Sequence, residues 1–249
     1  MKKIVQKNIK NQAVVIPGSK SISHRMMICA SLSIGTSNIK NLLQSDDIGL
    51  TVNALEQMGA DIDQVLENYY RVKGFGGNPQ PCNKKIYLGN SGTSMRLLTG
   101  IAALGKTFYT LTGDLRMCER PMVELLDALT MLKIHAESIN KNGTPPVYIK
   151  GGNRAGGFVK IDCSKSSQYL SSLLMIGALM KNGLDIFLAS PPVSSPYVDL
   201  TIDIMKKFSI EAHKIDSMHY QVLGRQSYVH GDFFVEPDLS NAGYFWAIG

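Results

Sequence analysis

The chain has 249 residues, of which 44% are hydrophobic, and a formal net charge of +6. Four isolated cysteines, with no CxxC pair and no histidine at metal-ligand spacing, exclude a disulfide framework and a structural zinc site. No apolar run has the length of a membrane span or the form of a signal peptide, so we expect a cytoplasmic protein with no membrane partner.

The basic balance of the chain favours anionic partners. Its lysines are scattered rather than gathered into a tail, and no RNP-like aromatic motif, zinc finger or long basic stripe occurs. We therefore expect no nucleic-acid partner and predict that a few basic residues converge on a small anionic ligand.

The first informative element opens at residues 17–25, Pro-Gly-Ser-Lys-Ser-Ile-Ser-His-Arg. Pro-Gly is a common turn and serine a favoured N-cap, so a helix is predicted to begin here. Lys20 and Arg25 lie in its first turns beside several hydroxyls. Because a helix N-terminus presents free N–H groups and a positive dipole end, this opening is typical of a phosphate or carboxylate site. A well-capped helix without a ligand is the other interpretation.

The same construction, a small polar cluster that leads into an apolar helix rich in Ala, Gly and Ser, occurs four times. The segments are 21–32, 92–104, 168–179 and 240–249. A second series of predicted helices lies between them, within 46–62, 120–137 and 196–213, with Met58, Leu132 and Phe208 as the matched helix ends. Both series recur at intervals of 71 to 76 residues, which indicates an internal structural repeat.

Short runs with strand-like alternation, bounded by Gly, Asn or Pro, fall between the helices. They are 39–43, 71–75, 85–89, 107–113, 147–151, 158–164, 185–190, 220–224 and 233–237. The predicted fold class is α/β (α+β), made of repeated βαβαββ-type units, three of which fit within the chain. A fourth unit begins at residue 240, so we expect the chain to be a truncated portion of a longer protein.

Six motifs, taken in order, make the chain resemble the EPSP synthase family, the 3-phosphoshikimate 1-carboxyvinyltransferases. They are PGSKSISHR at 17–25, LGNSGTSMR at 88–96, RMCERPM at 116–122, SSQYLSSLLM at 166–175, SSPYVDLT at 194–201 and VEPDLSNAGYF at 235–245. The resemblance implies an inside-out α/β barrel of two similar domains, each with three repeated units. It places the first domain at 16–237 and assigns 1–15 and 238–249 to the second.

The resemblance also implies a reaction of the shikimate pathway, which leads to chorismate and the aromatic amino acids. The enolpyruvyl group of phosphoenolpyruvate is transferred to the 5-hydroxyl of shikimate 3-phosphate, and phosphate is released. This addition and elimination requires no metal or organic cofactor. Both substrates are polyanions, so cations, hydroxyl donors and acid/base groups have to converge on them. The full-length protein is expected to be a monomer.

The matched motifs imply roles for individual residues. Lys20 is the expected catalytic residue and contacts both substrates. The residues expected to bind shikimate 3-phosphate are Lys20, Ser21, Arg25, Ser166, Ser167, Gln168, Ser194 and Tyr197. Those expected to bind phosphoenolpyruvate are Lys20, Asn90, Gly92, Arg120 and Gln168. Glycine at position 92 lets the backbone approach a ligand closely, and it implies sensitivity to glyphosate, which occupies the phosphoenolpyruvate site in the family.

Several polar residues have a plainer interpretation. Ser166 and Ser167 are suited to capping the helix that follows them. We expect Arg96 and Arg116 to be ordinary surface or interdomain ion-pair residues. His24 is expected to be structural, because its neighbours in the sequence offer no carboxylate to orient it as a base.

Two other functions fit part of the sequence. UDP-N-acetylglucosamine enolpyruvyl transferase shares the chemistry, but it carries Lys-Asn where this chain has Lys20-Ser21 and a reactive cysteine at the position of Leu115. A non-catalytic anion- or RNA-binding domain of similar fold is the alternative from another class. In the EPSP synthase family the second half supplies the main acid/base carboxylates, so this chain alone is expected to lack catalysis.

Overall fold

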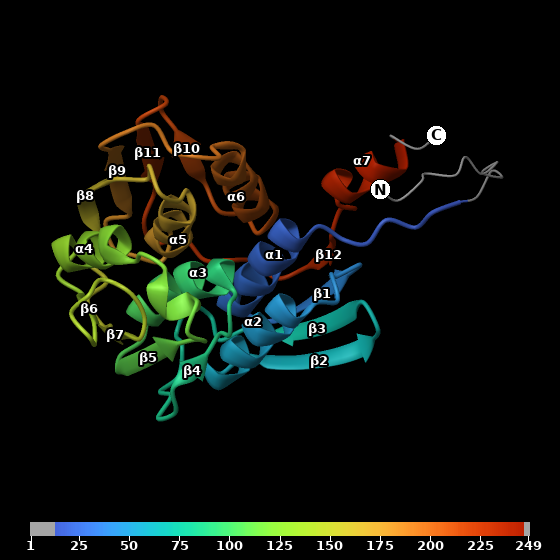
Figure 1. The fold of residues 1–249 in the computed structure, drawn as a ribbon, viewed down its shortest axis with the longest axis horizontal. Coiled ribbons are helices and arrows are strands. Elements are labelled where there is room, and N and C mark those ends of the chain that lie inside the picture. The colour runs from blue at the N-terminus through green and yellow to red at the C-terminus, as the bar shows by residue number, and fades with distance from the viewer. Residues whose placement is uncertain (1–12, 247–249) are drawn as a thin grey trace, which may run out of the picture.

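The computed structural model describes residues 13–246, so most of segment 1–15 and the last residues of segment 238–249 lie outside the described residues. Within that range, three four-stranded sheets surround a group of helices (Figure 1).

The elements follow one another as three similar units. The first contains α1 (Lys20–Leu32), β1 (Thr36–Lys40), α2 (Asp46–Gln57), β2 (Asp61–Leu66) and β3 (Tyr69–Lys73). The second contains β4 (Ile86–Tyr87), α3 (Gly92–Ala103), β5 (Phe108–Thr112), α4 (Val123–Met131), β6 (His135–Ser138) and β7 (Val147–Lys150). The third contains β8 (Gly157–Ile161), α5 (Gln168–Gly177), β9 (Leu184–Leu188), α6 (Pro196–Lys207), β10 (Ala212–Lys214) and β11 (His219–Val222), and β12 (Asp232–Phe234) and α7 (Leu239–Trp246) follow it.

All three sheets share one topology. Their strand orders are β12-β1-β3-β2, β4-β5-β7-β6 and β8-β9-β11-β10, and in each the first pair is parallel and the other neighbours are antiparallel. The repeated βαβαββ fold class is therefore confirmed, and the first unit takes its leading strand, β12, from the far end of the chain. Asn38 on β1 lies opposite Asp232 on β12 and donates to its carboxylate at 2.6 Å. This pairing closes the three units into a ring.

The helices are of two kinds. Helices α1, α3 and α5 lie between the sheets and are buried along most of their length, whereas α2, α4 and α6 bury only one face. Helix α1 packs against α2 and α6, and α5 packs against α6 and α3. One continuous hydrophobic core thus joins the units and fixes the relative positions of the helix N-termini.

Some predicted boundaries were wrong for local reasons. Helix α4 begins at Val123 rather than at 120, because Met117–Glu119 form a 3-10 turn and Pro121 follows it. Strand β1 ends at Lys40, because Asn41 adopts a left-handed conformation with φ 60°. Strands β2, β6 and β10 were not predicted at all.

The start of α1 is fixed by the segment that follows β12. Ser19 donates its N–H to the carbonyl of Glu236 at 2.9 Å, and Asp238 donates to the carbonyl of Pro17 at 2.9 Å. A Cβ at Gly18 would lie 2.0 Å from the carbonyl oxygen of Asn41, so only glycine allows this close approach. The first turn of α1 is therefore held in place from outside the helix.

Candidate active site

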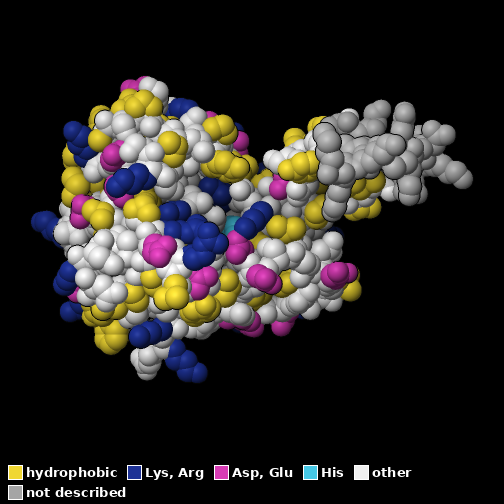
Figure 2. Space-filling view, viewed as in Figure 1, with side chains coloured by type: hydrophobic (Ala, Val, Ile, Leu, Met, Phe, Trp, Pro, Cys, Tyr) yellow, Lys and Arg dark blue, Asp and Glu magenta, His cyan; other side chains and the backbone are white. Residues whose placement is uncertain are grey.

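A pocket of about 300 Å³ lies at the N-terminal ends of α1, α5 and α6. Figure 2 shows lysine and arginine side chains gathered in a hollow near the centre of the viewed face. The residues that line the pocket are Ser21, Arg25, Arg96, Lys165, Ser166, Ser167, Gln168, Val193, Ser194 and Tyr197. The pocket thus contains seven of the eight residues expected to bind shikimate 3-phosphate; Lys20, the eighth, directly precedes Ser21.

Arg25 forms the floor of this pocket and is only 1% exposed. Its Nε donates to Thr201 Oγ1 at 2.7 Å, its Nη1 to the carbonyl of Ser21 at 3.0 Å, and its Nη2 to Ser171 Oγ and the carbonyl of Tyr197, both at 3.3 Å. All four partners are neutral. Burial lowers the pKa of Arg25 to about 10, which still leaves the guanidinium charged at neutral pH.

Three arginines at the site, Arg25, Arg96 and Arg120, form no ion pair with a carboxylate of the described residues. A buried cation that lacks a counter-charge is unfavourable, because its lost hydration is not offset. A bound anion would supply the missing charge. Arg25 is buried and Arg96 and Arg120 are half-buried, so the hollow is cationic and suited to an anion.

Arg96 is half-buried and lines the pocket, so it is not an ordinary surface residue; an interdomain ion pair, the other expectation for it, stays a prediction. Its Nη1 donates to Gln168 Oε1 at 2.8 Å, and its guanidinium lies over the ring of Tyr169 at 5.5 Å. Gln168 in turn donates from Nε2 to Thr93 Oγ1 at 2.9 Å. Arg96 and Gln168 together join the N-termini of α3 and α5. Arg116, in contrast, is exposed, and it is not among the residues that line the pocket.

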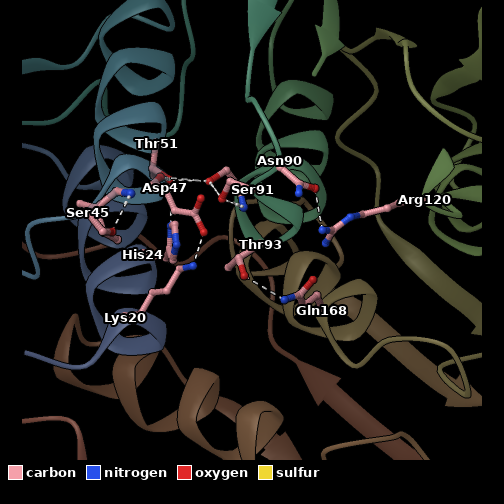
Figure 3. A network of polar contacts seen from close by, with 12 residues as sticks. Lys20, His24, Ser45, Asp47, Thr51, Asn90, Ser91, Thr93, Arg120 and Gln168 are labelled. Carbon is pink, nitrogen blue, oxygen red and sulfur yellow. Dashed lines mark hydrogen bonds and ion pairs between the residues drawn. The ribbon is translucent and has the colours of Figure 1, made fainter. Parts of the chain in front are cut away.

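Lys20 forms an ion pair with Asp47, the second residue of α2 (Figure 3). Its side chain is 46% exposed, so the ammonium group remains accessible to a ligand. The sequence did not single out Asp47 as a site residue; its signal was the acidic pair Asp46-Asp47 at the start of the predicted helix. The pair places one carboxylate next to the expected catalytic lysine.

Asn90, Gly92 and Arg120 form the neighbouring part of the site. Arg120 Nη2 donates to Asn90 Oδ1 at 2.6 Å, and a Cβ at Gly92 would lie 2.7 Å from Arg120 Nη1 and 3.2 Å from Arg96 Nη1. Figure 3 shows Lys20 with Asp47 on one side of the site and Asn90 with Arg120 on the other. All the residues expected to bind phosphoenolpyruvate are therefore close to the hollow.

The serines before α5 combine capping with exposure to the pocket. Ser166 Oγ accepts the N–H of Gln168 at 3.2 Å, whereas the side chain of Ser167 makes no capping hydrogen bond. Lys165 forms an ion pair with Glu124 at 2.7 Å, which raises the pKa of the lysine. Ser194 adopts a left-handed conformation with φ 54° just before α6.

The N-termini of α1, α3 and α5 add to the positive potential that the lysine and arginine side chains create at the site. Helices α1, α3 and α5 carry no acidic residue in their first turns, whereas α2, α4 and α6 each carry at least one. An acidic first turn offsets the helix dipole, so α1, α3 and α5 leave their dipoles free to act on a ligand.

No group of His, Cys, Asp and Glu side chains within residues 13–246 is arranged to hold a metal ion. In the same part of the chain, every helix is too short or too polar to cross a membrane.

Known proteins of one family resemble this chain in sequence. The family model for EPSP synthase (3-phosphoshikimate 1-carboxyvinyltransferase) matches residues 6–249. The chain is 41% identical over 241 residues to the 3-phosphoshikimate 1-carboxyvinyltransferase of Tolumonas auensis, covering 95% of this chain and 56% of that protein. It is 40% identical over 238 residues to that of Methanococcus aeolicus, covering 94% and 55%.

A solved structure of an EPSP synthase is similar to this chain in fold. A structure of EPSP synthase from Acinetobacter baumannii matches with a TM-score of 0.83 and 27% sequence identity, covering 93% of this chain and 51% of that one. The chain spans about half the length of the relatives that it matches. By its sequence motifs, its repeated units and these matches, the chain belongs to the EPSP synthase family.

Proposed function

We propose that this chain provides a substrate-binding half-site for transfer of the enolpyruvyl group of phosphoenolpyruvate to the 5-hydroxyl of shikimate 3-phosphate. The observation that carries the proposal is the convergence on one pocket of arginines that pair with no carboxylate of the described residues and of helix N-termini that lack acidic residues. Both substrates carry a phosphate and a carboxylate, which are the charges that this arrangement lacks.

Shikimate 3-phosphate fits the pocket at the start of α5 and α6. Arg25 supplies its one unused Nη1 hydrogen, and the hydroxyls of Ser21, Ser166, Ser167, Ser194 and Tyr197 supply further donors. A buried guanidinium held by neutral partners suits a phosphate or carboxylate, because it is already desolvated and oriented.

Phosphoenolpyruvate fits the neighbouring region of the site, which is formed by Lys20, Asn90, Gly92 and Arg120. Gln168 lies between the two substrates and contacts both. Lys20 is the proposed catalytic residue, because a flexible ammonium can follow charge as it develops. In the reaction the methylene carbon of phosphoenolpyruvate gains a proton and the 5-hydroxyl attacks the adjacent carbon. The attacking hydroxyl gives up its proton to a base, and loss of phosphate and of a methyl proton then forms the enol ether of the product. No cofactor enters this sequence of steps.

The proposed domain organisation and oligomeric state are those implied by the resemblance to the EPSP synthase family. Residues 16–237 form the first of two domains, residues 1–15 and 238–249 belong to the second, and the complete protein acts as a cytoplasmic monomer. The three closed units support this division, because the segments at 17–19 and 236–238 lie side by side where the chain enters and leaves the ring.

Phosphate release by the complete gene product tests the proposal. We expect release from phosphoenolpyruvate that depends on shikimate 3-phosphate, and a loss of about 100-fold or more in Lys20→Ala. Lys106→Ala is the matched control, because this exposed lysine follows the opposite end of α3, roughly 20 Å from the site.

Two other outcomes would contradict the proposal. Release that depends on UDP-N-acetylglucosamine and not on shikimate 3-phosphate would identify the related transferase. Salt-dependent binding of RNA without phosphate release would identify a non-catalytic domain.

A further inference from the structure

Four polar side chains beneath the site form a continuous buried chain across three helices. They are His24 on α1, Thr51 on α2, Ser94 on α3, and Ser91 at the N-cap of α3, and each is at most 1% exposed. His24 Nδ1 lies 2.8 Å from Thr51 Oγ1, Thr51 Oγ1 lies 2.7 Å from Ser94 Oγ, and Ser94 Oγ lies 2.6 Å from Ser91 Oγ. We call these four residues the α1–α3 chain.

One direction of these hydrogen bonds uses every available hydroxyl proton. Thr51 Oγ1 lies 3.1 Å and Ser94 Oγ 3.5 Å from the carbonyl of Asp47, which can only accept, and we infer that Thr51, the nearer hydroxyl, donates there. Thr51 then accepts from Ser94 and from Nδ1–H of His24, and Ser94 accepts from Ser91. In this arrangement every hydroxyl proton of the α1–α3 chain is donated in a hydrogen bond.

In this arrangement His24 is a neutral ring with the proton on Nδ1, which is the tautomer that we infer. Its Nε2 is buried without a hydrogen-bond partner in the described part of the chain, and an unpaired lone pair there is less costly than an unpaired N–H donor. Burial, with Lys20 as the next largest cause, lowers the pKa of His24 to about 3, so the ring stays neutral at physiological pH.

The two ends of the α1–α3 chain lie next to residues on opposite sides of the site. His24 lies one helical turn after Lys20, and Thr51 holds the carbonyl of Asp47, the partner of Lys20. Ser91 directly follows Asn90 and precedes Gly92. In Figure 3 His24, Thr51 and Ser91 lie between Lys20 on one side and Asn90 on the other. The α1–α3 chain thus connects the turn of α1 that carries Lys20 with the N-terminus of α3, beside Asn90.

A second polar cluster has the equivalent place at the other end of the site. Thr201 on α6 accepts from Arg25 on α1 at 2.7 Å and contacts Ser171 on α5 at 2.8 Å. Thr51 and Thr201 occupy equivalent positions in the repeat, because each lies two turns before the C-cap of its helix, Met58 or Phe208. One threonine per cluster joins three helices in both cases.

We propose that Thr51, through the α1–α3 chain, is a positioning residue for the phosphoenolpyruvate end of the site, and that Thr201 has the same role for the shikimate 3-phosphate end. This inference rests on the proposed function. Replacing such a buried polar cluster by apolar groups of the same shape is often neutral for stability, so its use here favours a role in geometry.

Exchange of one hydroxyl for a methyl group tests the proposal in the complete gene product. In Thr51→Val the KM for phosphoenolpyruvate is expected to rise about tenfold, while the KM for shikimate 3-phosphate stays within about twofold. Thr201→Val is the matched variant and should show the reverse pattern. Thr51→Ser, which keeps the hydroxyl, should restore the unsubstituted KM values.

A measurement on the 249-residue chain itself provides a second arm that does not depend on turnover. The ¹⁵N spectrum of the His24 ring is expected to show a protonated Nδ1 and an unprotonated Nε2 from pH 5 to pH 8. A protonated Nε2 would overturn the assigned direction of the α1–α3 chain and the role that rests on it.

The outcomes separate this inference from the proposed function. Equal rises of both KM values in Thr51→Val, or no rescue by Thr51→Ser, would overturn the positioning role while turnover upholds the function. No turnover by the unsubstituted protein would overturn the function and this role together.

Discussion

At the scale of single residues, the site depends on charges that the described chain leaves unpaired. Arg25 is held by two hydroxyls and two carbonyls, an arrangement that fixes its position without neutralising it. A carboxylate partner would bind the same guanidinium and compete with a substrate anion. The neutral partners therefore keep Arg25 available for a ligand, at some cost in stability.

The buried His24 ring makes stability depend on pH. Its pKa is lowered to about 3 in the folded chain, so between pH 6.5 and 3 only the unfolded chain takes up this proton. The free energy of unfolding therefore falls as the pH falls, by about 1.4 kcal/mol per unit at most. Lys20, Asp47 and Arg25 are the charged groups that act on this ring.

Urea unfolding at pH 7 and pH 5 measures this effect. Between pH 7 and pH 5 we expect the free energy of unfolding to fall by about 2 kcal/mol less in His24→Asn than in the unsubstituted chain. His213→Asn, at an exposed histidine, is the matched control. The same pH dependence in His24→Asn and the unsubstituted chain would show that this ring is not the source.

Gly92 is the residue where one methyl group should affect one substrate alone. In Gly92→Ala the new Cβ would lie 2.7 Å from Arg120 Nη1, so the guanidinium has to move away from Asn90. We expect a rise of about 3- to 30-fold in the KM for phosphoenolpyruvate, weaker inhibition by glyphosate, and little change for shikimate 3-phosphate.

Gly49→Ala is the matched control for this substitution. A Cβ at Gly49 meets no atom within 4 Å and lies on an exposed face of α2, where alanine favours the helix. Unchanged inhibition by glyphosate in Gly92→Ala would refute the assignment of Gly92 to the phosphoenolpyruvate site.

At the scale of elements, the sequence predicted the helices better than the strands. Helices α1, α3 and α5 were predicted because their polar openings and apolar bodies recur at nearly constant intervals. Strands β2, β6 and β10 were missed because each lies at a sheet edge and buries few side chains, as in the exposed run from Asp61 to Leu66. An edge strand with few buried side chains lacks the alternation on which prediction depends.

Some site residues could likewise be predicted from sequence motifs, whereas others are recognisable only in the folded structure. Ser21, Arg25 and Gln168 were predicted from motifs and lie in the pocket. Arg96 was not predicted to line the pocket, although it occupies the position in the second unit that Arg25 occupies in the first; this repeat was a signal that could have identified it. Asp47 pairs with a lysine on another helix, and only the fold brings these two together.

Strand β12 offers a test of how the ring closes. Phe233 stacks on Phe208 of the third unit with ring centroids 4.0 Å apart, whereas Phe234 on the same strand is 55% exposed. We expect Phe233→Ala to lower the free energy of unfolding by about 2 kcal/mol and Phe234→Ala by less than about 0.5 kcal/mol. Urea unfolding compares the two, and equal losses would argue against closure through Phe233.

At the scale of the whole molecule, closure of the ring and assembly of the site have one cause. The three units share one core, and that core aims the N-termini of α1, α3 and α5 at a common region. Each unit contributes part of the site: the first Lys20 and Arg25, the second Asn90 and Arg120, and the third Gln168. No single unit could bind both proposed substrates.

The central claim is that the pocket beside Arg25 binds shikimate 3-phosphate, and calorimetric titration of this compound into the 249-residue chain tests it most directly. We predict saturable binding that is weakened at least about tenfold in Arg25→Ala and in Ser167→Ala, and unchanged in the exposed-site control Arg116→Ala. Thermal unfolding of each variant establishes that it is folded. A folded chain that shows no saturable binding, or an Arg25→Ala variant that binds like the unsubstituted chain, would contradict the account.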